Sequence, residues 1–180
     1  MNFKKICFFV IVTRLFDGLT TFYATPDLKY ELNPIVRMFD LGWLGFLFLG
    51  VIFTALVIIM SYKSFQRLGL FNIKSNSFKE YCSFFFFDKN IRYFEMTYVL
   101  PLKKRFFVFI GQVFPLVLIY YSFFLIINNT FIIGTYHVSF LNDFFLKIYK
   151  IHGLIVSVVP VVIFFLVSFL YLRKSYKIYN

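Results

Sequence analysis

The first apolar stretch of the chain carries two opposite charges, Arg14 and Asp17, where a membrane protein rarely places them. In a helix, positions 14, 17 and 21 share one stripe, which adds Thr21, and Thr20 flanks that stripe. Inside a bilayer, a carboxylate and a guanidinium pair with each other, relay a proton, or bind an ion or a polar ligand. We define the intramembrane polar cluster as Arg14, Asp17, Thr20 and Thr21.

The depth of these charges follows from the helical rise. Counted from Lys5 at about 1.5 Å per residue, Arg14 lies about 13 Å and Asp17 about 18 Å into a hydrocarbon core about 30 Å thick. A central Arg or Asp costs about 2.5–3.5 kcal/mol, whereas each of the ten Leu, Ile, Phe and Val residues of the stretch contributes about −0.3 to −0.6 kcal/mol. These contributions nearly cancel, so insertion of this helix alone would be only marginally favourable. We therefore expect the stripe to face other helices or water.

A second polar group lies between the first and second apolar stretches. Asn33 is a favourable N-cap and Pro34 a favourable first helical residue, so we expect a helix to begin there. Glu31 lies just before that amino terminus, where an anion is stabilised. The outer-loop cluster consists of Glu31, Asn33 and Arg37. Because the loop is short, we expect this cluster to line a cavity together with Asp17.

These two segments resemble an uncharacterised prokaryotic family of multispan membrane proteins. Its members share Asp-x-x-(Ser/Thr)-Thr in the first span and Glu-x-Asn-Pro at the opening of the second, which here are Asp17–Thr21 and Glu31–Pro34. The match covers about residues 11–40, and Lys29 and Tyr30 stand where members often have glycine. The resemblance implies a small multispan protein and assigns no reaction.

Composition agrees with a membrane protein. Of the 180 residues, 61% are apolar and 15% are charged, whereas a soluble domain is about half apolar and a quarter charged. Such a composition argues against a soluble globular domain, a disordered chain and a disulfide scaffold. Four stretches reach the length of about 20 apolar residues that a bilayer requires, at 6–24, 42–60, 106–127 and 151–172. We predict an all-α polytopic membrane protein, a single domain over 1–180 with a four-transmembrane-helix bundle and interfacial segments.

The basic residues indicate orientation. Fourteen of them lie in the amino terminus, the segment 61–105 and the carboxyl tail, and four lie on the opposite side. Cytoplasmic segments are rich in Lys and Arg, so we predict a multi-pass protein of the cell membrane with both termini in the cytoplasm. The net charge of +11 therefore reports orientation, and we expect no nucleic-acid partner.

Two segments between the spans are too apolar for free loops. The cytoplasmic segment 61–105 mixes large aromatics with charge, which suits either a chain lying among anionic lipid headgroups or a small packed subdomain. The outer segment 128–150 is predicted to form an interfacial helix or a cap. The expected partners are the lipid bilayer, anionic headgroups at the cytoplasmic face, and another membrane protein.

The cysteines, the histidines and the helix-breaking residues of the chain do not indicate a further functional site. Cys7 and Cys82 are expected to be reduced thiols, and His137 and His152 have no metal-ligand spacing, so we expect no metal and no cofactor. The third span contains Gly111-Gln112 and Pro115, and the fourth contains Pro160. We expect helix packing to account for these four residues, with helix kinks as the alternative.

Three functions fit the pattern. The first is a non-enzymatic membrane protein whose polar cluster organises the bundle or a partner interface. The second is a small transporter or ligand-binding module that uses Asp17 and Glu31. The third is an intramembrane hydrolase in which the same two carboxyl groups act as acid and base. The first is the function we expect from the sequence.

Overall fold

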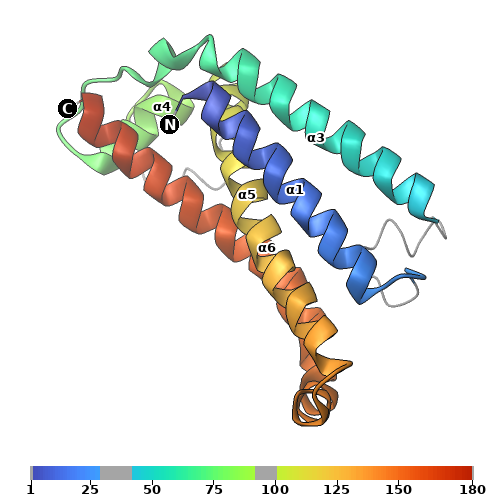
Figure 1. The fold of residues 1–180 in the computed structure, drawn as a ribbon. Helices are drawn as coiled ribbons and strands as arrows, with labels where there is room; N and C mark the ends of the chain where they lie inside the picture. The colour runs from blue at the N-terminus through green and yellow to red at the C-terminus, as the bar shows by residue number, and fades with distance from the viewer. Residues whose placement is uncertain (1, 29–41, 92–100, 180) are drawn as a thin grey trace.

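The structure is a computed structural model that describes residues 2–28, 42–91 and 101–179, with the backbone alone described over 139–153. Its helices are α1 (Phe3–Ala24), α3 (Trp43–Phe65), the 3-10 helix η1 (Leu68–Phe71), α4 (Phe78–Phe87), α5 (Lys103–Thr135) and α6 (Ser139–Tyr179). The described residues contain no strand, and four of the helices are long and apolar enough to cross a membrane. The predicted all-α, four-helix architecture is therefore confirmed (Figure 1).

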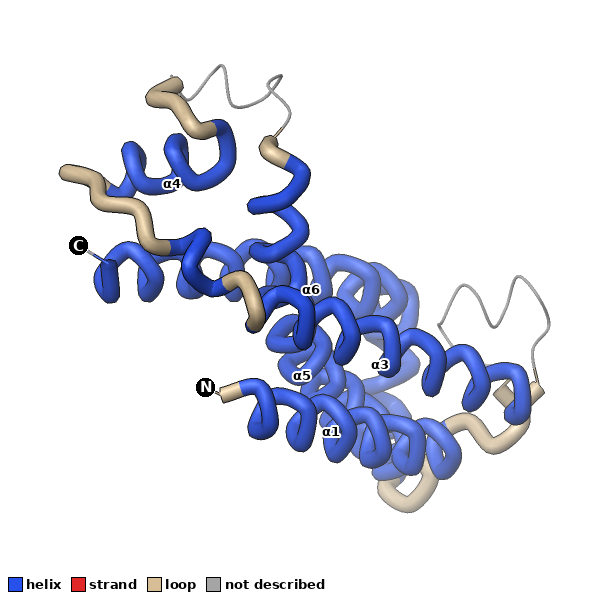
Figure 2. Tube along the Cα trace, turned by 90° about the horizontal axis from the view of Figure 1, so that it is seen from above, coloured by secondary structure: helices blue, strands red, loops and turns tan. Residues whose placement is uncertain are grey.

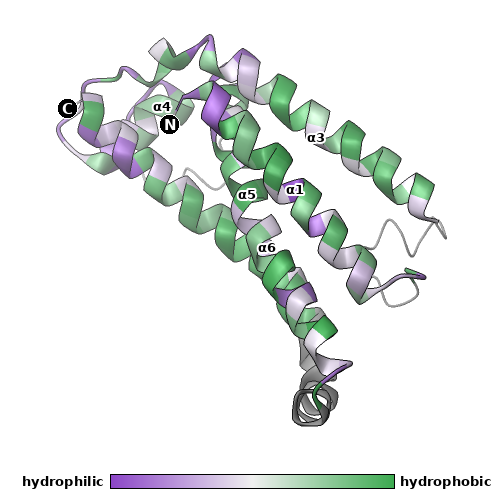
Figure 3. Ribbon diagram, viewed as in Figure 1, coloured by the Kyte–Doolittle hydropathy of each residue, from purple (hydrophilic) through white to green (hydrophobic). Residues whose placement is uncertain are grey.

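Helix α5 occupies the centre of the bundle. It packs against α1, α3 and α6, and α1 and α3 also contact each other (Figure 1). In its most apolar stretch of 18 residues, α5 is 44% buried, whereas α3 is 11% buried. Large apolar side chains of α1, α3 and α6 are exposed, and the ribbon of these helices is mostly green, the colour of hydrophobic residues, in Figure 3. Lipid is the solvent that such side chains require, because in water they would expose a large hydrophobic area.

Both termini lie at one end of the bundle (Figures 1 and 2), which we call the basic end. The amino termini of α1 and α5 and the carboxyl termini of α3 and α6 are there, together with α4. Thirteen of the fourteen basic residues assigned to one side of the membrane are described, and all thirteen belong to this end. The described acidic residues of the same end are Glu80 and Asp88. The basic end is therefore strongly positive.

The described part of segment 61–105 folds against the basic end. Phe71, Tyr81 and Phe85 are fully buried there, and the rings of Phe71 and Phe85 stack with centroids 4.7 Å apart. The Tyr81 hydroxyl donates a hydrogen bond to the Phe71 carbonyl oxygen at 3.1 Å, and burial raises the pKa of that hydroxyl. Burial also raises the pKa of the Cys82 thiol to about 11, so the thiol stays protonated at neutral pH. Of the two alternatives for this segment, the structure has the packed subdomain.

An arginine at the start of α5 attaches α4 to the bundle. The Arg105 guanidinium donates to the carbonyl oxygens of Phe84 and Phe85 in the last turn of α4 and pairs with Asp88 at 2.9 Å. Asp88 is the left-handed residue that ends α4, with φ of 58°. A cation at the carboxyl end of a helix satisfies its free carbonyl groups and its dipole. Arg105 therefore fixes the position of α4 relative to α5.

The predicted outer segment, 128–150, is mostly helical. Helix α5 continues through Thr135 and α6 begins at Ser139, so the backbone of 128–150 belongs to the ends of these two helices, and its place at the membrane interface stays a prediction. With 33 and 41 residues, the two helices contain more residues than the roughly 20 that a core about 30 Å thick requires, and the start of α6 turns away from the rest of that helix (Figure 1). For α5, polar residues beyond the apolar stretch have partners on α1: Asn129 contacts Thr21, and Tyr136 contacts the Ala24 carbonyl oxygen.

Candidate functional site

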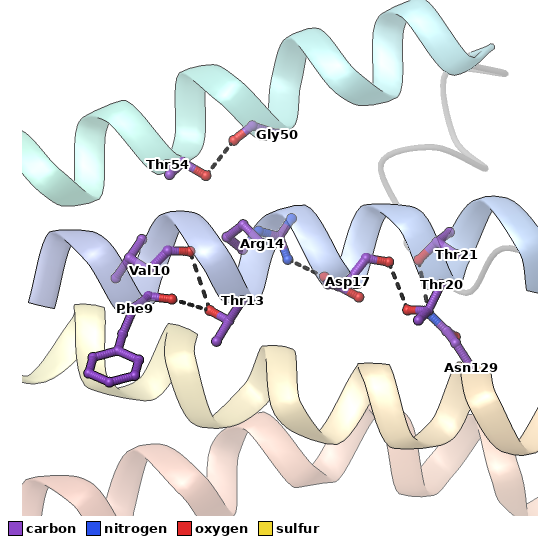
Figure 4. Close-up of polar contacts among 10 residues, drawn as sticks. All are labelled: Phe9, Val10, Thr13, Arg14, Asp17, Thr20, Thr21, Gly50, Thr54 and Asn129. Carbon is purple, nitrogen blue, oxygen red and sulfur yellow. Dashed lines mark hydrogen bonds and ion pairs between the residues drawn. The ribbon is translucent and has the colours of Figure 1, made fainter.

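Helix α1 brings the two intramembrane charges together. Arg14 Nη1 donates to Asp17 Oδ2 at 2.5 Å, a contact between residues three positions apart on one helix (Figure 4). Asp17 is 4% exposed and Thr21 is 6% exposed, whereas the Arg14 side chain retains 23% of its accessible surface. The expectation that the stripe turns away from lipid is therefore confirmed for Asp17 and Thr21.

The threonines of the cluster connect α1 to α5. The Asn129 amide of α5 donates to Thr21 Oγ1 at 2.9 Å and to Thr20 Oγ1 at 3.4 Å (Figure 4). Thr20 in turn donates to the Asp17 carbonyl oxygen at 3.1 Å, within its own helix. Sequence reasoning missed Asn129 as a site residue. Its position in the sequence could have indicated a role, because an asparagine at the end of an apolar run needs a hydrogen-bond partner when it is buried.

The ends of α1 and α3 are also held by side chains from elsewhere in the chain. The Tyr136 hydroxyl, just after α5, donates to the Ala24 carbonyl oxygen at 2.7 Å. The Trp43 indole N–H, at the start of α3, donates to the Pro26 carbonyl oxygen at 2.7 Å. Carbonyl groups after the last turn of a helix lack partners of their own, so these contacts satisfy them. Tyr and Trp are also the residues that membrane proteins favour at the interface.

A second set of buried polar contacts lies where α3 crosses α5. Ser64 Oγ donates to the Val108 carbonyl oxygen at 2.5 Å, and Gln112 Nε2 donates to Ser64 Oγ at 2.9 Å. A Cβ on Gly111 would lie 2.6 Å from Ser64 Cβ and 2.7 Å from the Met60 carbonyl oxygen. Small residues permit such close approach between membrane helices. Packing therefore explains Gly111 and Gln112, as the sequence predicted.

Several predicted site residues are not tested by the structure. The outer-loop cluster, Glu31, Asn33 and Arg37, lies outside the described residues, so its cavity with Asp17 stays a prediction. Within the described ranges, no three His, Cys, Asp or Glu residues gather closely enough to hold a metal ion. Cys7 and Cys82 are free thiols.

A half-open cavity of about 400 Å³ lies toward the basic end. Helix α5 supplies Leu116 and Tyr120, α1 supplies Ile6, and α6 supplies Leu170 and Lys174. The residues that line it do not include Arg14 or Asp17. The cavity and the polar cluster are therefore separate features.

Four membrane-length helices with apolar outward faces define the class: a small multi-pass integral membrane protein. No protein-family model, curated protein or solved structure matches this chain. The resemblance over residues 11–40 therefore stays a prediction that rests on its motifs alone.

Proposed function

We propose that this is a small non-enzymatic protein of the cell membrane whose intramembrane polar cluster organises its helix bundle. The observation that supports the proposal is the pair of hydrogen bonds from Asn129 to Thr21 and Thr20, which joins α5 to the cluster on α1. Polar side chains act as links between membrane helices because hydrocarbon offers them no other partner. The Arg14–Asp17 pair adds to this role by leaving neither charge alone in the membrane.

The described contacts favour this role over the alternatives. A partner interface would need the cluster on an outward face, whereas Asp17 and Thr21 are buried inside the bundle. The transporter and hydrolase alternatives both require Glu31 beside Asp17, and Glu31 lies outside the described residues. No described contact supports either of those two functions.

Removal of the α1–α5 link tests the proposal. We expect Asn129→Leu to lower the stability of the bundle in detergent by about 1 kcal/mol, since single interhelical hydrogen bonds contribute about 0.6 kcal/mol on average and up to about 1.7. Thermal unfolding followed by circular dichroism measures the change. Thr130→Val is the matched control, because Thr130 is exposed and its hydroxyl donates to Ile126 of its own helix.

The outcome separates the candidate functions. An Asn129→Leu protein as stable as the Thr130→Val control would contradict the organising role. A protein that assembles normally with Asp17→Asn, but no longer binds or moves a solute that the unaltered protein handles, would support the transporter alternative instead.

We also propose that the basic end faces the cytoplasm, which places both termini there. The support is the charge of that end, with thirteen described basic residues against two described acidic residues. A green fluorescent protein fused after Asn180 should fluoresce, and alkaline phosphatase fused at the same place should be inactive in a bacterial host. The reverse pattern would place the basic end outside the cell.

A further inference from the structure

The cavity near the basic end is lined by residues of several helices. Helix α5 contributes Leu116 and Tyr120, α1 contributes Ile6 and α6 contributes Leu170, and the end of α3 and η1 complete the lining. All four residues belong to the four candidate spans, and Tyr120 and Leu170 are more than half exposed. Hydrocarbon surrounds this part of the chain, so a half-open apolar cavity here takes up lipid in preference to water.

The lining of the same cavity contains one cation. Lys174 is exposed and lies one helical turn beyond Leu170 on α6, in the direction of the basic end, and its neighbour Ser175 is buried. Along α6, Lys174 lies about 6 Å from Leu170, the rise of four residues, and Ile178 and Tyr179 continue the lining beyond it. A lipid with its acyl chain at Leu170 can therefore place its phosphate at Lys174.

We propose that this cavity binds one anionic glycerophospholipid. An acyl chain lies along Leu116, Tyr120 and Leu170, and the headgroup phosphate contacts Lys174. Charge complementarity favours an anionic lipid, because the basic end has thirteen described basic residues and two described acidic ones. The volume of about 400 Å³ is that of a small-molecule site, so the cavity holds one acyl chain and the rest of the lipid stays in the surrounding bilayer. The proposal concerns a different part of the bundle from the polar cluster and does not depend on it.

The site is built for a lipid rather than for a free anion. A soluble phosphate is normally held by several charge-assisted hydrogen bonds, whereas the cavity lining offers one cation, Lys174. Most of the remaining lining is aliphatic or aromatic, which gives no binding energy to inorganic phosphate but does to an acyl chain.

Lipid titration of the full-length protein tests the proposal. The protein in dodecyl maltoside is titrated with phosphatidylglycerol, with phosphatidylcholine of the same acyl chains, or with inorganic phosphate. Native mass spectrometry counts the bound lipid, and thermal unfolding reports stabilisation. We expect one phosphatidylglycerol to be retained and to raise the melting temperature, phosphatidylcholine to bind more weakly, and inorganic phosphate to have no effect.

Two pairs of variants locate the site. Lys174→Gln should weaken phosphatidylglycerol binding about five-fold, the effect of one Lys near an anionic headgroup. Lys177→Gln, on the same helix but not in the cavity lining, should leave binding unchanged. Leu170→Trp should fill the cavity and remove the retained lipid, and Leu166→Trp, equally exposed but outside the lining, should not.

Three results would overturn the proposal. Equal losses with Lys174→Gln and Lys177→Gln would indicate general attraction to a positive surface. Equal lipid retention by Leu170→Trp and Leu166→Trp would place the acyl chain elsewhere. Stabilisation by inorganic phosphate equal to that by phosphatidylglycerol would indicate an anion site with no lipid. Circular dichroism checks that each variant is folded. If Lys174→Gln is unfolded, the comparison of Leu170→Trp with Leu166→Trp tests the lipid site instead.

Discussion

Asp17→Ala is expected to destabilise the bundle by about 3–5 kcal/mol, the largest effect of any single substitution considered for this chain. The substitution leaves the Arg14 guanidinium near mid-membrane without the carboxylate that now lies 2.5 Å away. The Arg14 side chain is 23% exposed, and the medium it meets there is hydrocarbon, so water cannot replace the lost partner. Thermal and chemical unfolding in detergent measure the loss.

The double variant Arg14→Met/Asp17→Ala is the matched control. It removes both charges, so we expect it to recover most of the stability lost in Asp17→Ala, as replacement of a buried ion pair by apolar residues is often neutral or stabilising. Arg14→Met alone should be destabilising, since it leaves the Asp17 carboxylate without the guanidinium. Effects of the two single substitutions that simply add in the double variant would show that the pair is not coupled.

Gly111→Ala has the second largest expected effect, a loss of about 1–3 kcal/mol and several degrees in melting temperature. The added methyl group would lie 2.6 Å from Ser64 Cβ and 2.7 Å from the Met60 carbonyl oxygen, so α3 must move away from α5. That movement stretches the 2.5 Å hydrogen bond from Ser64 Oγ to the Val108 carbonyl oxygen. Thermal unfolding and near-ultraviolet circular dichroism report the change.

Gly50→Ala controls for the general effect of a glycine substitution. Gly50 lies in α3, and a Cβ there meets no atom within 4 Å. Alanine is the better helix former, so this variant should be as stable as the unaltered protein or slightly more stable. Equal stability of Gly111→Ala and Gly50→Ala would contradict a close crossing of α3 and α5.

The sequence predicted the boundaries of the first two long helices better than those of the last two. The predicted spans 6–24 and 42–60 fall almost wholly within α1 (Phe3–Ala24) and α3 (Trp43–Phe65), because an apolar run of bilayer length is a local signal. The spans 106–127 and 151–172 lie inside the much longer α5 and α6. Hydropathy detects the part of a helix that matches hydrocarbon, and it does not detect the continuation of α5 beyond it, where Asn129 contacts α1.

The sequence did not decide between the two alternatives for segment 61–105, because both depend on contacts between distant residues. Large aromatics mixed with charge suit a membrane surface and a packed core equally well. The choice depends on whether Phe71, Tyr81 and Phe85 find apolar partners, and those partners, Val108 and Phe109, lie in α5. Such contacts between distant parts of the chain have no local signal.

The sequence predicts one part of the candidate site, and the tertiary structure decides the other. Arg14 and Asp17 pair because positions three apart on a helix are neighbours, and helical spacing is written in the sequence. The cost of burying charges in hydrocarbon likewise predicts that the stripe turns inward, whichever helix it meets. The identity of that helix, and of Asn129 as the partner of Thr21 across 108 residues, depends on how four apolar helices settle against one another. Hydropathy does not encode which helices pair, so the shape of their surfaces decides that arrangement, and Gly111 marks one close approach of α5 to α3.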